Sequence, residues 1–288
     1  MKIKEIEFGI SITCVLWKRR NSLIRWGIIG GKEEIIKRMA LSIVDDLGKL
    51  ASKNSFKLIE LQTMPPFDAE ILWEIKDDLK RIISPFDVTY HLPGGEINIA
   101  AINPRVREAS INEIKSLIDL AAELEIKKIL MHPGSYTAMP EAYRRMERMI
   151  KQLAQKSIYE IFDYAKDRGI SLSLENLEEI FFCSPEEFKP FVKRGIGLVL
   201  DTAHAMKSDV DPLAFVKKFE RRISEVHLVD GKKGDVIHRY PFGSGEVNCL
   251  KVLDKLIEIN YPGKVIFEEI SEENLTKSLG YLKDNGYL

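Results

Sequence analysis

The sequence predicts one α/β domain in which eight parallel strands close into a (β/α)8 barrel. Short β-rich runs alternate with longer amphipathic stretches along the chain, and the length of 288 residues suits such a barrel. No linker or shift in composition divides residues 1–288. A doubly wound open sheet is the rival fold, and it is disfavoured because no G-x-G-x-x-G turn follows the first strand.

Eight runs have the length and apolar content of strands. In the fifth, serines and Glu175 alternate with leucines, so we expect its polar face to line the barrel and its leucines to meet the helices. The runs are Ile6–Ile12, Phe56–Gln62, Asp87–His91, Lys128–His132, Ser171–Asn176, Gly197–Asp201, Ser224–Val229 and Lys264–Glu269.

Apolar residues recur between these runs with a period close to 3.6, which predicts helices. Several of these stretches open on residues that commonly begin a helix, either a capping side chain or a proline in the first turn. The signals are Ser110 with Glu113, Ser184 with Pro185, Asp211 with Pro212, and Asn248.

The charge balance excludes some functions. The chain has 43 Lys and Arg against 44 Asp and Glu, so bulk attraction to nucleic acid is not expected. The N-terminus shows no apolar signal-peptide core and no run approaches a membrane span, which predicts a cytoplasmic protein without membrane contact. Cys14, Cys183 and Cys249 are too scattered for a disulfide framework or a thiolate metal site.

Histidines and carboxylates gather where the expected strands end, and a barrel brings these ends together in a ring. A lone histidine there is usually structural, but five together indicate a metal site of the Zn2+, Mn2+, Fe2+ or Co2+ type rather than a Ca2+ site. The imidazoles are His91, His132, His204, His227 and His238, and the carboxylates are Glu60, Glu175, Asp201 and Glu268.

Two of these carboxylates are ambiguous from the residues alone. Glu60 fits either an inward functional group or the partner of a Lys or Arg. Glu268 and its neighbour Glu269 point to opposite faces, and alternation does not choose between them.

A glycine-rich loop, Phe242–Glu246, precedes the helix expected to begin at Asn248. Backbone amides at Gly243 and Gly245, beside a helix N-terminus, could hold an anion such as phosphate. A plain tight turn is the alternative.

Several stretches together resemble the xylose isomerase-like barrel superfamily, which includes endonuclease IV and many sugar isomerases and epimerases. The resemblance covers nearly the whole chain, and its motifs are specific only when taken together and in order. They are His91-Leu92-Pro93 with Ile97-Asn98, His132-Pro133-Gly134-Ser135, Leu174-Glu175-Asn176, Leu200-Asp201-Thr202-Ala203-His204, His227-Leu228-Val229-Asp230 and Ile266-Phe267-Glu268.

The resemblance implies a metal site made of Glu175, Asp201, His227 and Glu268, and so selects Glu268 over Glu269. The endonuclease branch adds ligands for a cluster of three zinc ions, so the implied cofactor is one to three Zn2+ or Mn2+ ions. Those added ligands would be His91, His132, His204 and His238, although Asp235 and His238 are one residue further apart here than in the family's Asp-x-His pair.

Two other positions depart from the endonuclease branch. Gly94-Gly95 stands where that branch carries an aromatic residue that enters the DNA stack, and Thr63-Met64-Pro65-Pro66 replaces its basic loop. The glutamate at position 60 makes this strand more similar to that of the sugar-acting branch.

The first functional hypothesis is therefore a metal-dependent isomerase or epimerase of a small sugar or sugar phosphate. Glu175 and Glu268 would act as base and acid around an enediolate, and His204 would orient the substrate or a second metal. Further substrate contacts are expected from Glu60, Asn98, Asn176, Asp230, Gly243 and Gly245.

The alternative is an endonuclease IV-like zinc phosphodiesterase that acts on abasic-site DNA, with DNA as its partner. A third possibility is a barrel that keeps the site but serves as a binding or regulatory protein.

Overall fold

The computed structural model describes residues 6–16, 33–64, 67–95, 97–135, 145–177, 181–235 and 240–288. Eight parallel strands follow one another in sequence order around a closed barrel, and β1 also pairs with β8. The strands are β1 Glu7–Ser11, β2 Leu58–Gln62, β3 Asp87–His91, β4 Lys128–Met131, β5 Ser171–Glu175, β6 Gly197–Asp201, β7 Ile223–Leu228 and β8 Lys264–Phe267. The predicted fold is confirmed, and the strands differ from the predicted runs by only one or two residues at an end.

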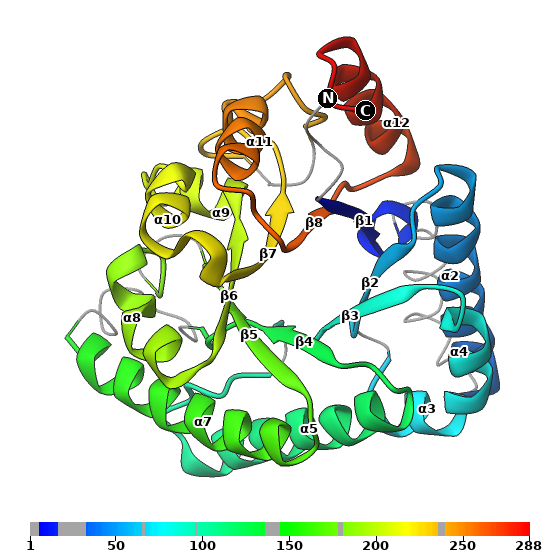
Figure 1. Ribbon diagram of the computed structural model, residues 1–288. Helices are drawn as coiled ribbons and strands as arrows, with labels where there is room; N and C mark the ends of the chain where they lie inside the picture. The colour runs from blue at the N-terminus through cyan, green and yellow to red at the C-terminus, as the bar shows by residue number, and fades with distance from the viewer. Residues whose placement is uncertain are drawn as a thin grey trace.

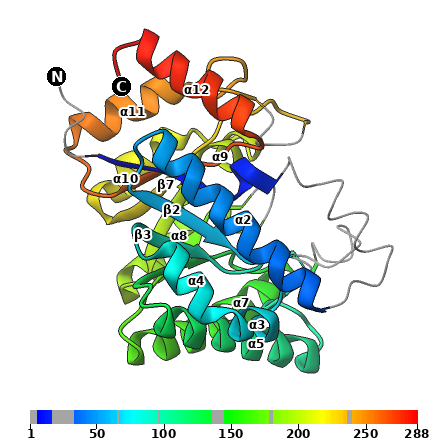
Figure 2. The same cartoon turned by 90° about the vertical axis from the view of Figure 1, so that its right-hand side faces the viewer.

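Helices surround the strands, as Figure 1 shows. In the turned view of Figure 2, α2 and α4 run along one side of the barrel. The helices are α2 Glu33–Lys53, α3 Ala69–Glu74, α4 Lys76–Ile83, α5 Pro104–Glu123, α7 Glu147–Asp167, α8 Pro185–Arg194, α9 Thr202–Lys207, α10 Pro212–Phe219, α11 Cys249–Glu258 and α12 Glu272–Asp284, with a 3-10 turn η1 at Glu220–Arg222.

Three of the four predicted helix starts are confirmed. Ser184 forms a capping box at α8, while Asp211 and Asn248 cap α10 and α11. The start predicted at Ser110 is wrong, because Asn103 caps α5 and Pro104 begins it.

Ser110 instead lies inside α5, where its hydroxyl donates to the carbonyl of Val106 at 2.9 Å. The same hydroxyl accepts the backbone N–H of Asn98 at 3.0 Å. The Ser110 hydroxyl thus bonds back onto the preceding turn of α5 and holds the loop at Asn98, and it caps no helix.

The two faces of each strand differ as predicted for β5. Leu172 and Leu174 belong to the apolar core beneath the helices. Ser173 and Glu175 face the barrel interior, where the hydroxyl of Ser173 lies 2.7 Å from that of Ser224 on β7. The pairing of β6 with β7 contains a bulge at Ser224. Because of this bulge, Ser224 and its neighbour Glu225 can both face the barrel interior.

The base of the barrel interior is closed by an ion pair and by close packing. At the base, Lys264 donates to Asp87 across the ring. Above it, Gly9 lies against Leu58 so closely that a Cβ would come within 2.5 Å of the leucine Cγ. The chemistry is therefore confined to the C-terminal ends of the strands, as in other barrels of this kind.

Cys14 and Cys249 are buried, Cys183 is half-buried, and all three are free thiols. Within the described ranges, no helix combines the length and apolar character that a bilayer crossing requires.

We expect Gly9→Ala to destabilise the barrel by about 1–3 kcal/mol, since the new methyl group overpacks the interior against Leu58. Urea unfolding followed by circular dichroism measures this. The control is Gly280→Ala in α12, where nothing lies within 4 Å of the added Cβ and helix propensity favours alanine. Equal stability of the two variants would contradict the account of the packed interior.

Candidate metal centre

Side chains from the ends of four consecutive strands meet in one buried space. Glu175 ends β5, Asp201 ends β6, His227 lies in β7 and Glu268 follows β8. One donor atom from each lies within 4.8 Å of the others. Asp201 and His227 are fully buried, and Glu268 is only 7% exposed. We call these residues the four-donor group.

The four-donor group fits a divalent cation. Nδ1 of His227 lies 2.8 Å from Oε1 of Glu175 and 3.2 Å from Oε2 of Glu268, yet it forms no hydrogen bond. Donor atoms that each bind one ion at about 2.0–2.2 Å lie apart from one another by distances like the two given above. Three carboxylates and one imidazole suit Zn2+ or Mn2+.

The strand-eight ambiguity is resolved by the geometry. Glu268 faces the barrel and contacts His227. Glu269 faces outward and accepts a hydrogen bond from Ser278 of α12, and burial raises its pKa to about 8. Glu268 thus lies in the barrel interior, and Glu269 contacts the layer of helices.

Polar side chains hold the strand ends that carry the donors. The Asn176 amide donates to the carbonyl of Asp201 at 3.1 Å and accepts its N–H at 2.8 Å. Thr202 Oγ1 donates to the carbonyl of Val229 at 2.7 Å and accepts its N–H at 2.9 Å. Each side chain replaces a pair of backbone bonds where two strands separate. Asn176, which was predicted to bind substrate, is therefore engaged in positioning Asp201.

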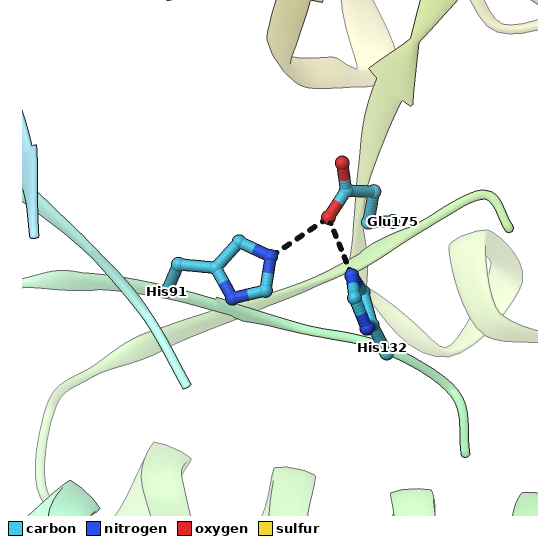
Figure 3. Close-up of side chains that lie close together, drawn as sticks. All are labelled: His91, His132 and Glu175. Atoms are coloured by element: carbon cyan, nitrogen blue, oxygen red, sulfur yellow. Dashed lines mark hydrogen bonds and ion pairs between the residues drawn. The ribbon is translucent and has the colours of Figure 1, made fainter. Parts of the chain in front are cut away.

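A second donor group shares Glu175, as Figure 3 shows. Nε2 of His91 and Nε2 of His132 lie 2.9 and 3.2 Å from Oε2 of Glu175. Nδ1 of His91 also lies 2.7 Å from the carbonyl of Leu92. Both ring nitrogens of His91 therefore face acceptors, which favours the doubly protonated imidazolium. We call His91 and His132 the histidine pair.

Electrostatics agree with this geometry. Burial alone would lower the pKa of His91, but Glu175 and more distant carboxylates raise it to about 9. Burial opposes ionisation of Glu175, yet His227 and the histidine pair hold its pKa well below the usual range. The pKa of His227 is raised well above normal by Glu60 and Glu175, against the effect of burial. The raised pKa values of His91 and His227 thus place positive charge beside the carboxylates.

Gly94 packs directly against the imidazole of His132, where any Cβ would collide with Nδ1. Burial and the nearby charge of His91 lower the pKa of His132. A side chain at position 94 would therefore displace the His132 ring from its present position.

Two more carboxylates lie on the other side of the His227 ring. Nε2 of His227 is 3.0 Å from Oε2 of Glu60 and 3.4 Å from Oε1 of Glu225. Glu60 is fully buried, and burial raises its pKa to about 7. Glu60 thus contacts the far side of a metal-ligand candidate, and its role in substrate binding stays a prediction.

The glycine-rich loop surrounds a carboxylate of its own chain. Oδ2 of Asp230 accepts the N–H groups of Gly243 at 3.0 Å and Gly245 at 2.9 Å. Oδ1 accepts those of Gly231 at 2.8 Å and Val247 at 3.0 Å. The predicted anion-binding amides thus hold Asp230, and neither the two glycines nor Asp230 is left to contact a phosphate.

The remaining predicted residues have different surroundings. Asn98 anchors the loop after β4, because its amide contacts the backbone N and O atoms of Ser135. The His204 ring lies 6.4 Å from that of His132. Among the described residues it belongs neither to the four-donor group, nor to the group of the histidine pair with Glu175, nor to a third possible donor group of Glu60, Glu225 and His227. His238 lies outside the described residues, and Asp235 accepts a hydrogen bond from Tyr240.

Sequence reasoning missed Glu225 and Thr202. Glu225 precedes His227 by two residues in one strand, so the alternation of faces could have placed it inside the barrel. Thr202 gave no such signal, because its bond across to β7 depends on how far the strand ends separate.

Comparisons with known proteins agree with this architecture. A family model described as "Xylose isomerase-like TIM barrel" matches residues 49–285. An uncharacterised protein of Methanocaldococcus jannaschii is 29% identical over 242 residues, which cover 76% of this chain and 80% of the relative. A probable endonuclease 4 of Mycobacterium leprae is 24% identical over 199 residues, covering 65% and 75%.

Solved structures share the fold at low identity. A D-tagatose 3-epimerase-like protein superposes with a TM-score of 0.71 at 24% identity, over 97% of this chain and 96% of that one. An IOLI protein with a bound zinc atom gives a TM-score of 0.69 at 17% identity, over 97% of both chains. The matched family model covers most of the barrel, and this chain belongs to the xylose isomerase-like TIM barrel family.

Proposed function

We propose that this protein is a divalent-metal-dependent isomerase or epimerase that moves a proton on a small sugar. The observation that carries the proposal is the convergence of two carboxylates, Glu175 and Glu268, on the same buried space as Asp201 and His227. A cation such as Zn2+ or Mn2+, held by these residues, would supply Lewis-acid polarisation of neighbouring substrate oxygens.

Glu175 and Glu268 are proposed as the groups that move the proton. They come from β5 and β8, which are separated by two strands in the ring, so they approach the site from different sides. One carboxylate would take the proton beside the substrate carbonyl, and the other would return a proton from its own side. The histidine pair contacts Oε2 of Glu175 and would orient that carboxylate.

The relatives support this class of reaction, since a D-tagatose 3-epimerase-like protein shares the fold over nearly the whole chain. The Asp230 loop favours an uncharged sugar over a sugar phosphate, because the amides of Gly243 and Gly245 already bind a carboxylate.

Asp201→Asn is expected to weaken Mn2+ binding by more than about tenfold, since it removes a charged ligand. The asparagine oxygen can still accept the N–H of His204, so the cap of α9 remains. Isothermal titration calorimetry of the full chain measures the affinity. Asp211→Asn, the same change at the cap of α10, is the control and should bind like wild type. Equal affinities of the two variants would remove Asp201 from the site.

Glu175→Gln is expected to lower turnover by about 10²–10⁴-fold because it deletes one proton-moving group. The metal-loaded protein is incubated in D2O with free ketoses that include D-tagatose, and NMR follows deuterium entry at the epimerised carbon. Glu258→Gln, at the exposed end of α11, should keep wild-type activity. Undiminished exchange in Glu175→Gln would exclude this carboxylate as the base.

A second candidate is a zinc phosphodiesterase that acts on abasic DNA, favoured by the group of His91, His132 and Glu175 and by the endonuclease 4 relative. Additional cations held there would suit phosphodiester hydrolysis. This alternative predicts that elemental analysis finds two or three zinc ions per chain. It also predicts that the protein nicks an abasic duplex and that this activity falls steeply with salt. The sugar proposal predicts one ion and no nicking.

A further inference from the structure

The His227 ring lies between two pairs of carboxylates deep in the barrel. Its Nδ1 faces Glu175 and Glu268 of the four-donor group. Its Nε2 faces Glu60 on β2 and Glu225 on β7. Both of these lower acids are at most 3% exposed, so no solvent replaces them as partners of the ring.

The hydrogen-bond geometry of the ring favours a proton on Nε2. Oε2 of Glu60 lies 3.0 Å from Nε2 in a hydrogen-bonding position. Nδ1 forms no hydrogen bond, although Oε1 of Glu175 lies 2.8 Å away. A proton on Nε2 leaves the Nδ1 lone pair directed at the four-donor group. Oε1 of Glu225, at 3.4 Å, is a longer contact on the same side.

Glu60 belongs to a buried layer of the barrel interior. In the barrel register it stands between Ser11 of β1 and Thr89 of β3, which are also buried. Glu225 stands beside Lys264 of β8, whose ammonium is engaged with Asp87. The acceptors of the Nε2–H group thus belong to two strands, β2 and β7. A rotation of the His227 ring would break its hydrogen bond to them.

We propose that Glu60 is a positioning residue that fixes the tautomer and orientation of His227, so that Nδ1 is presented to a divalent cation. The proposal rests on the metal-dependent function inferred above. It gives Glu60 a role in binding the cation, with no contact to the sugar. Glu225 is a weaker acceptor that keeps the lower side of the ring polar.

The experiment compares Glu60→Gln, Glu60→Leu and the control Thr89→Val, which changes the adjacent position in the same layer without touching His227. Zn2+ affinity is measured by chelator competition in the absence of sugar. We expect affinity to fall about tenfold in Glu60→Gln, whose amide oxygen can still accept, and about 100-fold in Glu60→Leu. Thr89→Val should match wild type.

Long-range 1H–15N spectra of the zinc-loaded, 15N-histidine-labelled protein report the tautomer. An Nε2–H signal from His227, retained in Glu60→Gln and lost or exchange-broadened in Glu60→Leu, is the expected result. If Glu60→Leu does not fold, the isosteric Glu60→Gln still decides through the affinity and the position of that signal.

Wild-type affinity and an unchanged His227 signal in every Glu60 variant that folds would overturn the positioning role while leaving the proposed function intact. A zinc ion bound between Glu60, Glu225 and Nε2, seen as a second equivalent that Glu60→Gln removes, would also overturn it. A wild-type protein that binds no divalent cation would overturn the proposed function, and the positioning role with it.

Discussion

The constraint on which the site depends is the crowding of carboxylates that are buried away from bulk solvent. Glu175, Asp201 and Glu268 bring three acidic groups within a few ångströms of one another. Ionised groups in such surroundings repel strongly and lose their hydration, so they require a positive partner. His91 and His227, whose pKa values are raised, supply positive charge beside these groups, and a divalent cation would supply it more compactly.

The strand ends are held rigidly for the same reason. Asn176 and Thr202 replace backbone hydrogen bonds at the point where neighbouring strands diverge. Asp230 draws the glycine-rich loop inward through four backbone amides. These contacts hold the backbone beside Glu175, Asp201 and His227, and a supported backbone keeps their side chains a short distance apart.

The sequence was sufficient for the barrel and for much of the donor set. Alternation and the ring of strand ends were enough to bring Glu175, Asp201 and His227 together, because these depend only on strand register. The start of α5 was misplaced, since a cap at Asn103 competed with the motif at Ser110.

The roles of several polar residues could not be predicted. Asn176, Asp230 and Glu60 carry the same functional groups as substrate-binding residues. Their partners are backbone atoms or rings that come from other strands, and only the folded geometry determines which groups they meet. The partner of the loop at Gly243 could not be predicted either, because the loop amide binds a side chain of the same protein.

The central claim is that side chains at four strand ends bind one cation. Anomalous diffraction from crystals grown with zinc tests this claim most directly. The account predicts a strong peak at the zinc edge about 2.0–2.2 Å from donor atoms of Glu175, Asp201, His227 and Glu268. Zinc absent from this position, with the four side chains turned away from one another, would contradict it.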